Sequence, residues 1–172
     1  GILTSYKDVG LAHEVFDQDR LLSLGKGKMA IGHVRYSGDG VANRLNAQPL
    51  MVRHIKGPLA VAHNGALING HELKEELEMT CDAEIIAYMI TRARLASKSI
   101  EEALEIAMTK LKGAYSLVIM SPKKIIAARD PQGFRPLCLG TIDGGYVVAS
   151  ETCALDSIGA KFLRDVEPGE IV

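Results

Sequence analysis

The chain has 172 residues, a length that fits one globular domain with a substantial core of its own. Its 47% hydrophobic and 24% charged residues are those of an ordinary soluble globule. Lysine and arginine (20) nearly balance aspartate and glutamate (21), and the net charge of -1 gives no electrostatic reason to expect a nucleic acid or an anionic membrane as partner.

Targeting, membrane and metal signals are not visible in this sequence. Its longest apolar stretches, such as 116–120, have the length of a strand, and no charged-then-apolar leader opens the chain. The cysteines Cys81, Cys138 and Cys153 are an odd number without metal-type spacing, and we expect reduced thiols in a cytoplasmic protein. The five histidines show no paired spacing on one helix face, so we expect no metal site.

The first third of the chain is expected to supply strands and loops. Residues 28–36 (KMAIGHVRY) predict a strand that enters a loop at 37–49, which is rich in glycine and asparagine. Two further strand-like pieces, 51–55 and 58–63, follow with a corner at Gly57-Pro58.

Two Asn-Gly pairs come next, at Asn64-Gly65 and Asn69-Gly70. Asn-Gly tolerates the positive φ angles of a two-residue turn, so the first pair predicts a tight hairpin. A second interpretation is that Asn64 and Gly65 present an amide side chain and a bare backbone N–H to a reacting oxygen. The second pair is interpreted as the entry to a helix.

The rest of the chain divides into a block of helices and a block of strands. Helices are predicted over 70–78, 83–96 and 99–113, the last with a capping box formed by Ser99 and Glu102 and a stop at Gly113. Strands are predicted over 114–121, 123–130, 136–141 and 146–150, before a short helix at 152–159 and a last strand. Such blocks indicate an α+β layered domain rather than a parallel α/β one.

Two charged residues are candidates for binding a substrate. Arg35 lies where the first predicted strand meets the loop, and it is either a solvent-facing side chain or a planar fork for a carboxylate. Asp82 precedes the helix expected at Ala83, where it serves as an N-cap, with Thr80 also available, or binds a substrate ammonium group. The two roles of Asp82 are not exclusive.

The stretch RDPQGFRP, residues 129–136, has aspartate, proline and glycine at positions that a type I turn prefers. We expect a strand-connecting corner, held by pairing of Asp130 with Arg129 or Arg135, without a catalytic role. His63, beside Asn64, is interpreted as a packed residue that supports the expected turn.

Several motifs occur together in one order. They are GHVRYS (32–37), NAQPL (46–50), AHNGALING (62–70), CDAE (81–84), RDPQGFRPLCLG (129–140) and ASETCALDSIGAKFLRDVEPGEI (149–171). This succession covers nearly the whole chain and resembles the glutaminase domain of the amidophosphoribosyltransferase family. His-Asn-Gly alone is shared by all class II glutamine amidotransferases, whereas Val-Arg-Tyr, NAQPL and RDPxGxRPL favour this member.

The resemblance implies an N-terminal-nucleophile hydrolase fold, a four-layer αββα sandwich of two antiparallel sheets between helices. It also implies a glutaminase in which an N-terminal cysteine attacks the side-chain amide of glutamine and releases ammonia. In full-length members this ammonia passes to phosphoribosyl pyrophosphate and gives 5-phosphoribosylamine, the first step of de novo purine biosynthesis. By motif match, Arg35 would hold the glutamine carboxylate and Asp82 its ammonium, while Asn64 and Gly65 would form the oxyanion hole.

The chain departs from the family pattern at three places. Gly1 stands where the nucleophilic cysteine belongs, and none of the three cysteines can act as an N-terminal thiol. We therefore expect residues 1–172 to be a glutaminase domain without its natural N-terminus and without the phosphoribosyltransferase domain, inactive in this form. The second departure precedes Asp82, which follows a helix almost directly where relatives have a glycine turn and a short strand. The third is Gly38-Asp39, where relatives usually carry small or hydroxyl residues.

The resemblance also sets expectations for ligands and partners. No cofactor is expected in this chain, because Mg²⁺ and, in some family members, a 4Fe-4S cluster belong to the missing regions. Glutamine is the expected partner, with phosphoribosyl pyrophosphate through the missing domain and a homo-oligomer by family analogy. The alternatives are another class II glutamine amidotransferase, or a non-catalytic glutamine-binding module that lacks the nucleophile.

Overall fold

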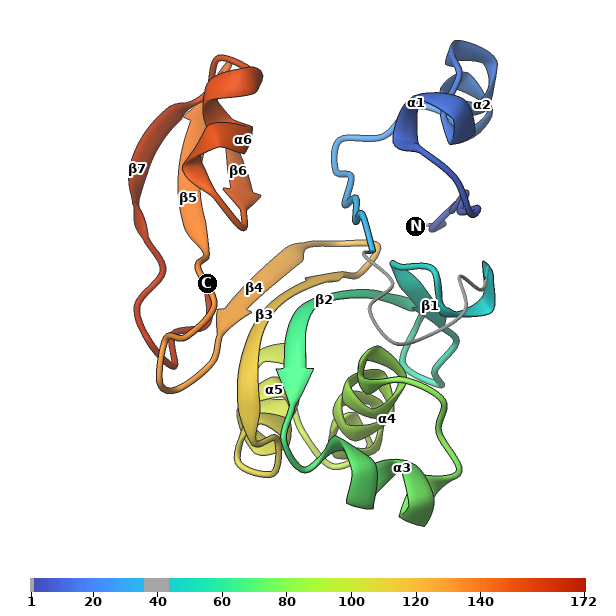
Figure 1. Ribbon diagram of the computed structural model, residues 1–172, viewed down its shortest axis with the longest axis vertical. Coiled ribbons are helices and arrows are strands. Elements are labelled where there is room, and N and C mark those ends of the chain that lie inside the picture. The colour runs from blue at the N-terminus through green and yellow to red at the C-terminus, as the bar shows by residue number, and fades with distance from the viewer. Residues whose placement is uncertain (1, 36–43) are drawn as a thin grey trace.

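Two antiparallel sheets organise the chain in the computed structural model, which describes residues 2–35 and 44–172 (Figure 1). The four-stranded sheet has the order β1-β2-β3-β4, with β1 at Leu50–Val52, β2 at Leu59–Leu67, β3 at Gly113–Met120 and β4 at Ile125–Arg129. The three-stranded sheet has the order β6-β5-β7, with β5 at Cys138–Ile142, β6 at Gly145–Ala149 and β7 at Lys161–Asp165.

The helices divide between the two sheets and the N-terminal segment. The short helices α1 and α2 span Ala12–Val15 and Gln18–Ser23, and a 3-10 helix, η1, spans Arg44–Asn46. The remaining helices are α3 at Gly70–Leu77, α4 at Asp82–Arg94, α5 at Ile100–Met108 and α6 at Thr152–Ser157. None of the helices in the described ranges combines the length and the apolar content that a membrane span requires.

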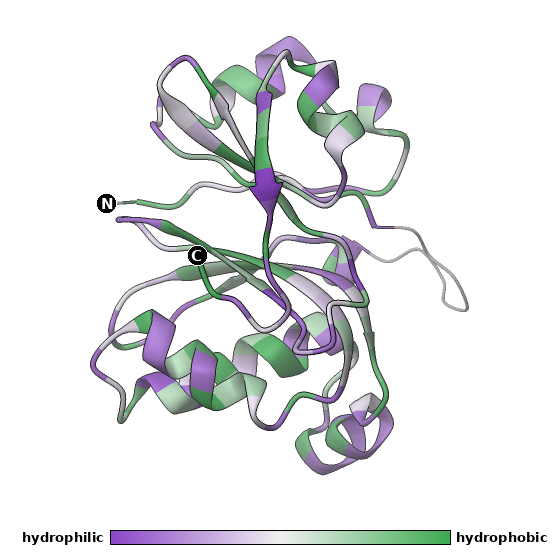
Figure 2. Ribbon diagram, turned by 90° about the vertical axis from the view of Figure 1, so that its left-hand side faces the viewer, coloured by the Kyte–Doolittle hydropathy of each residue, from purple (hydrophilic) through white to green (hydrophobic). Residues whose placement is uncertain are grey.

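The largest hydrophobic core lies between the four-stranded sheet and helices α4 and α5, which cover one face of that sheet (Figure 1). Val61 of β2 and Leu117 of β3 are fully buried in one cluster with Ile86 of α4 and Leu104 of α5. Figure 2 shows both green and purple segments along these helices, as expected when only one helix face is buried. Each fully buried side chain of this size contributes roughly 1.5–3 kcal/mol, so this layer dominates the stability of the domain.

The alternation of side chains along the strands places the two sheets face to face. In β4, Ile126 and Ala128 join the helix-side core, whereas Ala127 between them packs with Leu137 and Val166 of the three-stranded unit. In that unit, Leu139 and Val148 face the same cluster, and their neighbours Cys138 and Val147 face the opposite side with Leu155 of α6. The order is helix, sheet, sheet, helix, which confirms the predicted four-layer αββα arrangement.

The expected strand at 28–36 is wrong over its described part, because residues 28–35 form no strand. β1 pairs with β2 only from Leu59 to Val61. Beyond Val61, side chains of Gln48 and His33, rather than a strand, bind the backbone of His63. The expected loop at 37–49 is described only from residue 44, where η1 lies; residues 36–43 lie outside the described part.

The expected hairpin at Asn64-Gly65 is also wrong. β2 continues through both residues, and Gly65 lies opposite Tyr115 of β3. A Cβ added at Gly65 would lie 2.0 Å from the carbonyl oxygen of Ala114, and the φ of Gly65 is +150°. Glycine is needed here for the close approach of two strands, not for a reversal of the chain. The second pair does begin a helix, with Asn69 as the N-cap of α3.

The three predicted helices are present, with differences at their ends. Ser99 caps α5 as expected, because its Oγ accepts a hydrogen bond from the Glu102 N–H at 3.1 Å. The Glu102 carboxylate accepts from the Lys98 N–H, one residue earlier than in a capping box. α5 ends at Met108 rather than at Gly113, which instead begins β3.

The corner at RDPQG is confirmed, but it is held differently from the prediction. The Gly133 N–H donates to the Asp130 carbonyl oxygen at 2.9 Å, as a type I turn requires. Asp130 is fully buried, and its carboxylate accepts from four backbone N–H groups, those of Tyr115, Gln132, Phe134 and Arg135. The expected pairing with Arg129 or Arg135 is wrong, because the loop backbone already surrounds this carboxylate.

Asp130→Asn tests this arrangement. The substitution puts an NH₂ group against two of the four backbone donors, so we expect the free energy of unfolding to fall by at least about 2 kcal/mol. Urea titration followed by circular dichroism measures the change. Asp156→Asn, at an exposed position of α6, is the matched control and should stay within about 0.5 kcal/mol of the wild type. Equal stability of the two variants would contradict the assignment.

Candidate functional site

The open part of the β2 edge forms the centre of the site. Backbone N–H groups alternate between the two edges of a strand, so those of His63, Gly65 and Leu67 face the edge that β1 leaves uncovered. The His63 N–H donates to Gln48 Oε1 at 2.6 Å, and the Leu67 N–H donates to Asp82 Oδ2 at 2.8 Å. The Gly65 N–H lies between them, and among the described residues no side chain accepts from it.

The Asn64 side chain provides further donors next to Gly65. Its Oδ1 accepts from Arg135 Nη2 at 2.9 Å, and its Nδ2 donates to Ser150 Oγ at 3.2 Å. Arg135 belongs to the loop between β4 and β5, and Ser150 to the connection between β6 and α6. An amide NH₂ and a glycine N–H on successive residues are the kind of donors that stabilise an oxyanion.

Asp82 lies against the same strand, but not as an N-cap. Cys81 is the N-cap of α4, and Asp82 is the first helical residue. The Asp82 carboxylate is turned toward β2, where it accepts from the Leu67 N–H and forms an ion pair with Lys74 Nζ at 2.8 Å. Thr80 caps nothing either, because its hydroxyl and N–H both bind the Glu84 carboxylate. Asp82 therefore connects α3, α4 and the end of β2.

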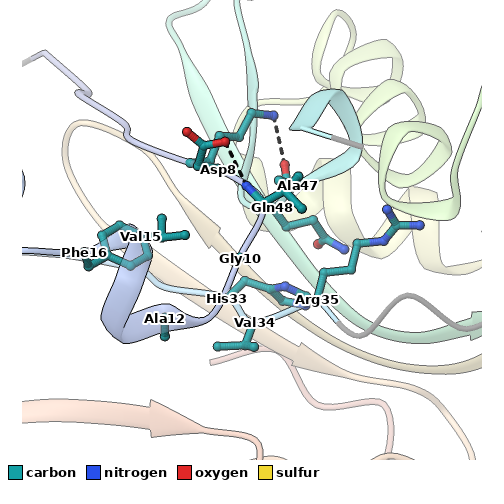
Figure 3. Close-up of a pocket in the computed structure, with 12 residues that line it drawn as sticks. Asp8, Gly10, Ala12, Val15, Phe16, His33, Val34, Arg35, Ala47 and Gln48 are labelled. Carbon is teal, nitrogen blue, oxygen red and sulfur yellow. Dashed lines mark hydrogen bonds between the residues drawn. The ribbon is translucent and has the colours of Figure 1, made fainter. Parts of the chain in front are cut away.

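Arg35 lines a neighbouring cavity of about 210 Å³. Figure 3 shows its guanidinium extending past the Gln48 side chain, with His33 at the base of the same segment. Arg35 is exposed and forms no ion pair with another described residue. Among the described residues, this arginine is thus a solvent-facing side chain, and its binding of a carboxylate stays a prediction.

His63 is buried, as expected, although it supports a strand rather than a turn. Burial lowers its pKa to about 4, and the charges of Arg135 and Lys74 act in the same direction, while Asp82 opposes them. Its carbonyl oxygen accepts from His33 Nε2 at 2.9 Å. The neutral imidazole therefore adds no charge to the edge of β2 near neutral pH.

The structure brings three of the four predicted residues to one strand. Asn64 and Gly65 belong to β2, and Asp82 binds the end of this strand. In the segment that carries Arg35, the contact with β2 is made by His33, two residues earlier. Sequence reasoning missed the roles of Gln48, His33, Arg135 and Ser150 as contacts of β2. All four lie in the quoted motifs (His33 in GHVRYS, Gln48 in NAQPL, Arg135 in RDPQGFRPLCLG and Ser150 in the motif at 149–171), so membership of a motif was the signal that could have suggested them.

The three cysteines differ in burial, and none lies among the contacts of β2 described above. Cys138 is 1% exposed, and burial, followed by the charge of Asp165, raises the pKa of its thiol. Cys81 is half-buried at the start of α4, and Cys153 is exposed on α6. Within residues 2–35 and 44–172, no group of three histidine, cysteine or acidic side chains is placed to hold a metal ion.

Comparison with known proteins shows the family to which the chain belongs. A model of the glutamine amidotransferase domain matches residues 33–157, and the chain belongs to this family. The amidophosphoribosyltransferases of Methanocaldococcus jannaschii and Bacillus subtilis are 44% and 45% identical to it over 97% and 99% of its length. The chain spans 37% of the length of each of these curated relatives.

Solved structures show the same fold. A glutamine phosphoribosylpyrophosphate amidotransferase from B. subtilis, complexed with ADP and GMP, superposes with a TM-score of 0.83 at 45% identity. A structure described as the allosteric regulatory enzyme of purine biosynthesis superposes with a TM-score of 0.85, also at 45% identity. Each match covers 94% of this chain and 36% of the solved chain. The predicted glutaminase-type fold is thereby confirmed.

The lowered pKa of His63 predicts a pH-dependent stability. Between pH 6.5 and 4 the unfolded chain takes up a proton on this residue that the folded chain does not, so stability falls as the pH falls. From pH 7 to 5 this effect amounts to about 2 kcal/mol. Urea titrations across that range should show a smaller loss for His63→Gln than for the wild type. His13→Gln, at an exposed position, should keep the wild-type pH dependence.

Proposed function

We propose that the chain is the glutaminase domain of an amidophosphoribosyltransferase, which releases ammonia from glutamine. The observation that carries the proposal is the pair of donors on successive residues of β2, Asn64 Nδ2 and the Gly65 N–H, the latter on an edge that no strand of the described residues covers. The family match and the similarity to amidophosphoribosyltransferases over nearly the whole chain support it. In the whole protein, the ammonia would pass to phosphoribosyl pyrophosphate and give 5-phosphoribosylamine.

The proposed reaction begins when the thiolate of an N-terminal cysteine, which this sequence does not contain, attacks the side-chain carbonyl carbon of glutamine. A C–S bond forms, and negative charge develops on the carbonyl oxygen, where Asn64 Nδ2 and the Gly65 N–H donate hydrogen bonds. The C–N bond then breaks and ammonia leaves with a proton from the α-amino group of the cysteine. Water hydrolyses the resulting thioester to glutamate.

The charged residues are proposed to hold the amino acid end of glutamine. The exposed guanidinium of Arg35 suits a carboxylate, which it can bind through two charge-assisted hydrogen bonds. The Asp82 carboxylate already accepts an ammonium group, that of Lys74, at 2.8 Å. The ammonium of glutamine has the same charge and donor chemistry, so it would take the place of Lys74 Nζ on Asp82.

The remaining parts of the proposal concern the whole protein. It would act in the cytoplasm, with Mg²⁺ and any iron–sulfur cluster outside residues 1–172. A non-catalytic glutamine-binding module is the rival function, and it shares the same contacts with Arg35 and Asp82. Glutamate release by the natural full-length protein separates the two, because a binding module performs no turnover.

The first test is glutaminase activity. The natural full-length protein should release glutamate from glutamine, and residues 1–172 alone should not. Asn64→Ala in the full-length protein should lower kcat by roughly 10²–10³-fold, since one oxyanion donor is removed. Gln132→Ala deletes an exposed side-chain amide in the RDPQG corner and should leave kcat unchanged. A full-length protein that binds glutamine without releasing glutamate would support the rival function instead.

The second test is glutamine affinity, measured by calorimetry on residues 1–172. Arg35→Gln removes the proposed carboxylate fork but keeps one amide donor, so about one charge-assisted hydrogen bond is lost, worth about 1.5–3 kcal/mol, and Kd should rise roughly 10–100-fold. Arg53→Gln removes an exposed arginine that follows β1 and should leave Kd unchanged. An unchanged Kd in Arg35→Gln would contradict this role.

A further inference from the structure

The orientation of the Asn64 amide follows from its contact with Arg135. Arg135 Nη2 lies 2.9 Å from Asn64 Oδ1. A guanidinium has only donors, so the amide oxygen, not the NH₂ group, must face it. The NH₂ group is therefore directed away from Arg135, where it donates to Ser150 Oγ at 3.2 Å. Because an NH₂ group carries two hydrogens, one remains available to a ligand oxygen.

The backbone around Arg135 is held from several directions. The Arg135 N–H donates to the buried Asp130 carboxylate at 3.1 Å, and its carbonyl oxygen accepts from Arg129 Nε at 2.7 Å. The next carbonyl, that of Pro136, accepts from Ser116 Oγ at 2.8 Å. Ser116 lies directly opposite Asn64 in the pairing of β2 with β3. The loop is thus fixed over the position where its guanidinium meets the amide.

A purely structural role does not account well for this arginine. Its Nε is buried and has no hydrogen-bond partner among the described residues. An unsatisfied buried donor reduces stability, so an apolar side chain would fill the same space at lower cost. The contact with Asn64 Oδ1 is the feature that requires a donor at this position. The positive charge also polarises the amide and strengthens its N–H groups as donors.

We infer that Arg135 is a positioning residue, which locks the Asn64 amide with its NH₂ group toward the reacting oxygen. The inference rests on the proposed glutaminase function and adds the residue that orients one of its two oxyanion donors. Without Arg135, the amide is free to rotate, and its oxygen would then repel a developing oxyanion. Substrate binding through Arg35 and Asp82 would be unaffected.

The test compares Arg135→Met and Arg135→Lys in the natural full-length protein. Methionine keeps length but no donor, so kcat should fall roughly 10–100-fold while KM changes less than about threefold. Lysine restores a donor to Oδ1 and should recover most of the lost kcat. Arg164→Met, which removes an exposed arginine paired with Glu170, should behave like the wild type.

Three results would overturn the inference: an unchanged kcat in Arg135→Met, an equal loss in Arg135→Lys, or a loss confined to KM. If Arg135→Met fails to fold, the Arg135→Lys variant still decides the question. The side-chain amide of Asn64 can be followed in this variant by ¹⁵N NMR on residues 1–172. The Asn64 NH₂ resonances should stay close to their wild-type positions in Arg135→Lys, and a large shift would contradict the orienting role. Absence of glutamate release by the wild type would refute the proposed function separately.

Discussion

The structure of the site depends on the unequal pairing of the two edges of β2. One edge pairs with β3 over residues 60–67, whereas β1 covers the other only as far as Val61. Backbone donors beyond that point must find other acceptors, because a strand edge exposes unpaired N–H groups. Gln48 and Asp82 satisfy two of them, and Gly65 lies between. An interrupted sheet edge, rather than a loop, thus supplies the backbone donor of the site.

The charged groups around this strand lie at separate positions. Arg35 is exposed beside the cavity, Asp82 is held by Lys74 at the end of β2, and Arg135 lies on the Asn64 amide. Burial keeps His63 neutral near pH 7, so it does not compete with these charges. Such a division would suit the proposed substrate, glutamine, which carries both a carboxylate and an ammonium group.

The layers of the fold explain how distant segments meet at one strand. The helix-side core fixes β2 and β3 on α4 and α5, and the small cluster around Ala127 holds the three-stranded unit on the opposite face. The loop from Asp130 to Pro136 joins the two sheets, and the buried Asp130 carboxylate organises it through backbone N–H groups. Asn64 is bound by both Arg135 and Ser150 because this loop and the end of β6 converge on β2.

Local patterns in the sequence determined the elements whose partners lie nearby. The apolar face of α4, the Ser99 cap and the RDPQG turn depend on residues within a few positions, so the predicted α+β layers and most strands were confirmed. The motifs also identified the family, and they indicated Asn64 and Gly65 as candidate residues of the site.

Only the tertiary structure decided how the edge of β2 is used. It placed Asn64-Gly65 inside a strand, turned Asp82 from a helix cap to the Leu67 N–H, and gave Asp130 backbone donors rather than an arginine. For Gly65 and Asp82, a partner distant in the sequence overrides a preference set by near neighbours. For Asp130, three of the four donors belong to its own loop and only Tyr115 is distant, so the path of that loop decides. Such contacts depend on which segments pack together, and the packing is set by the whole chain.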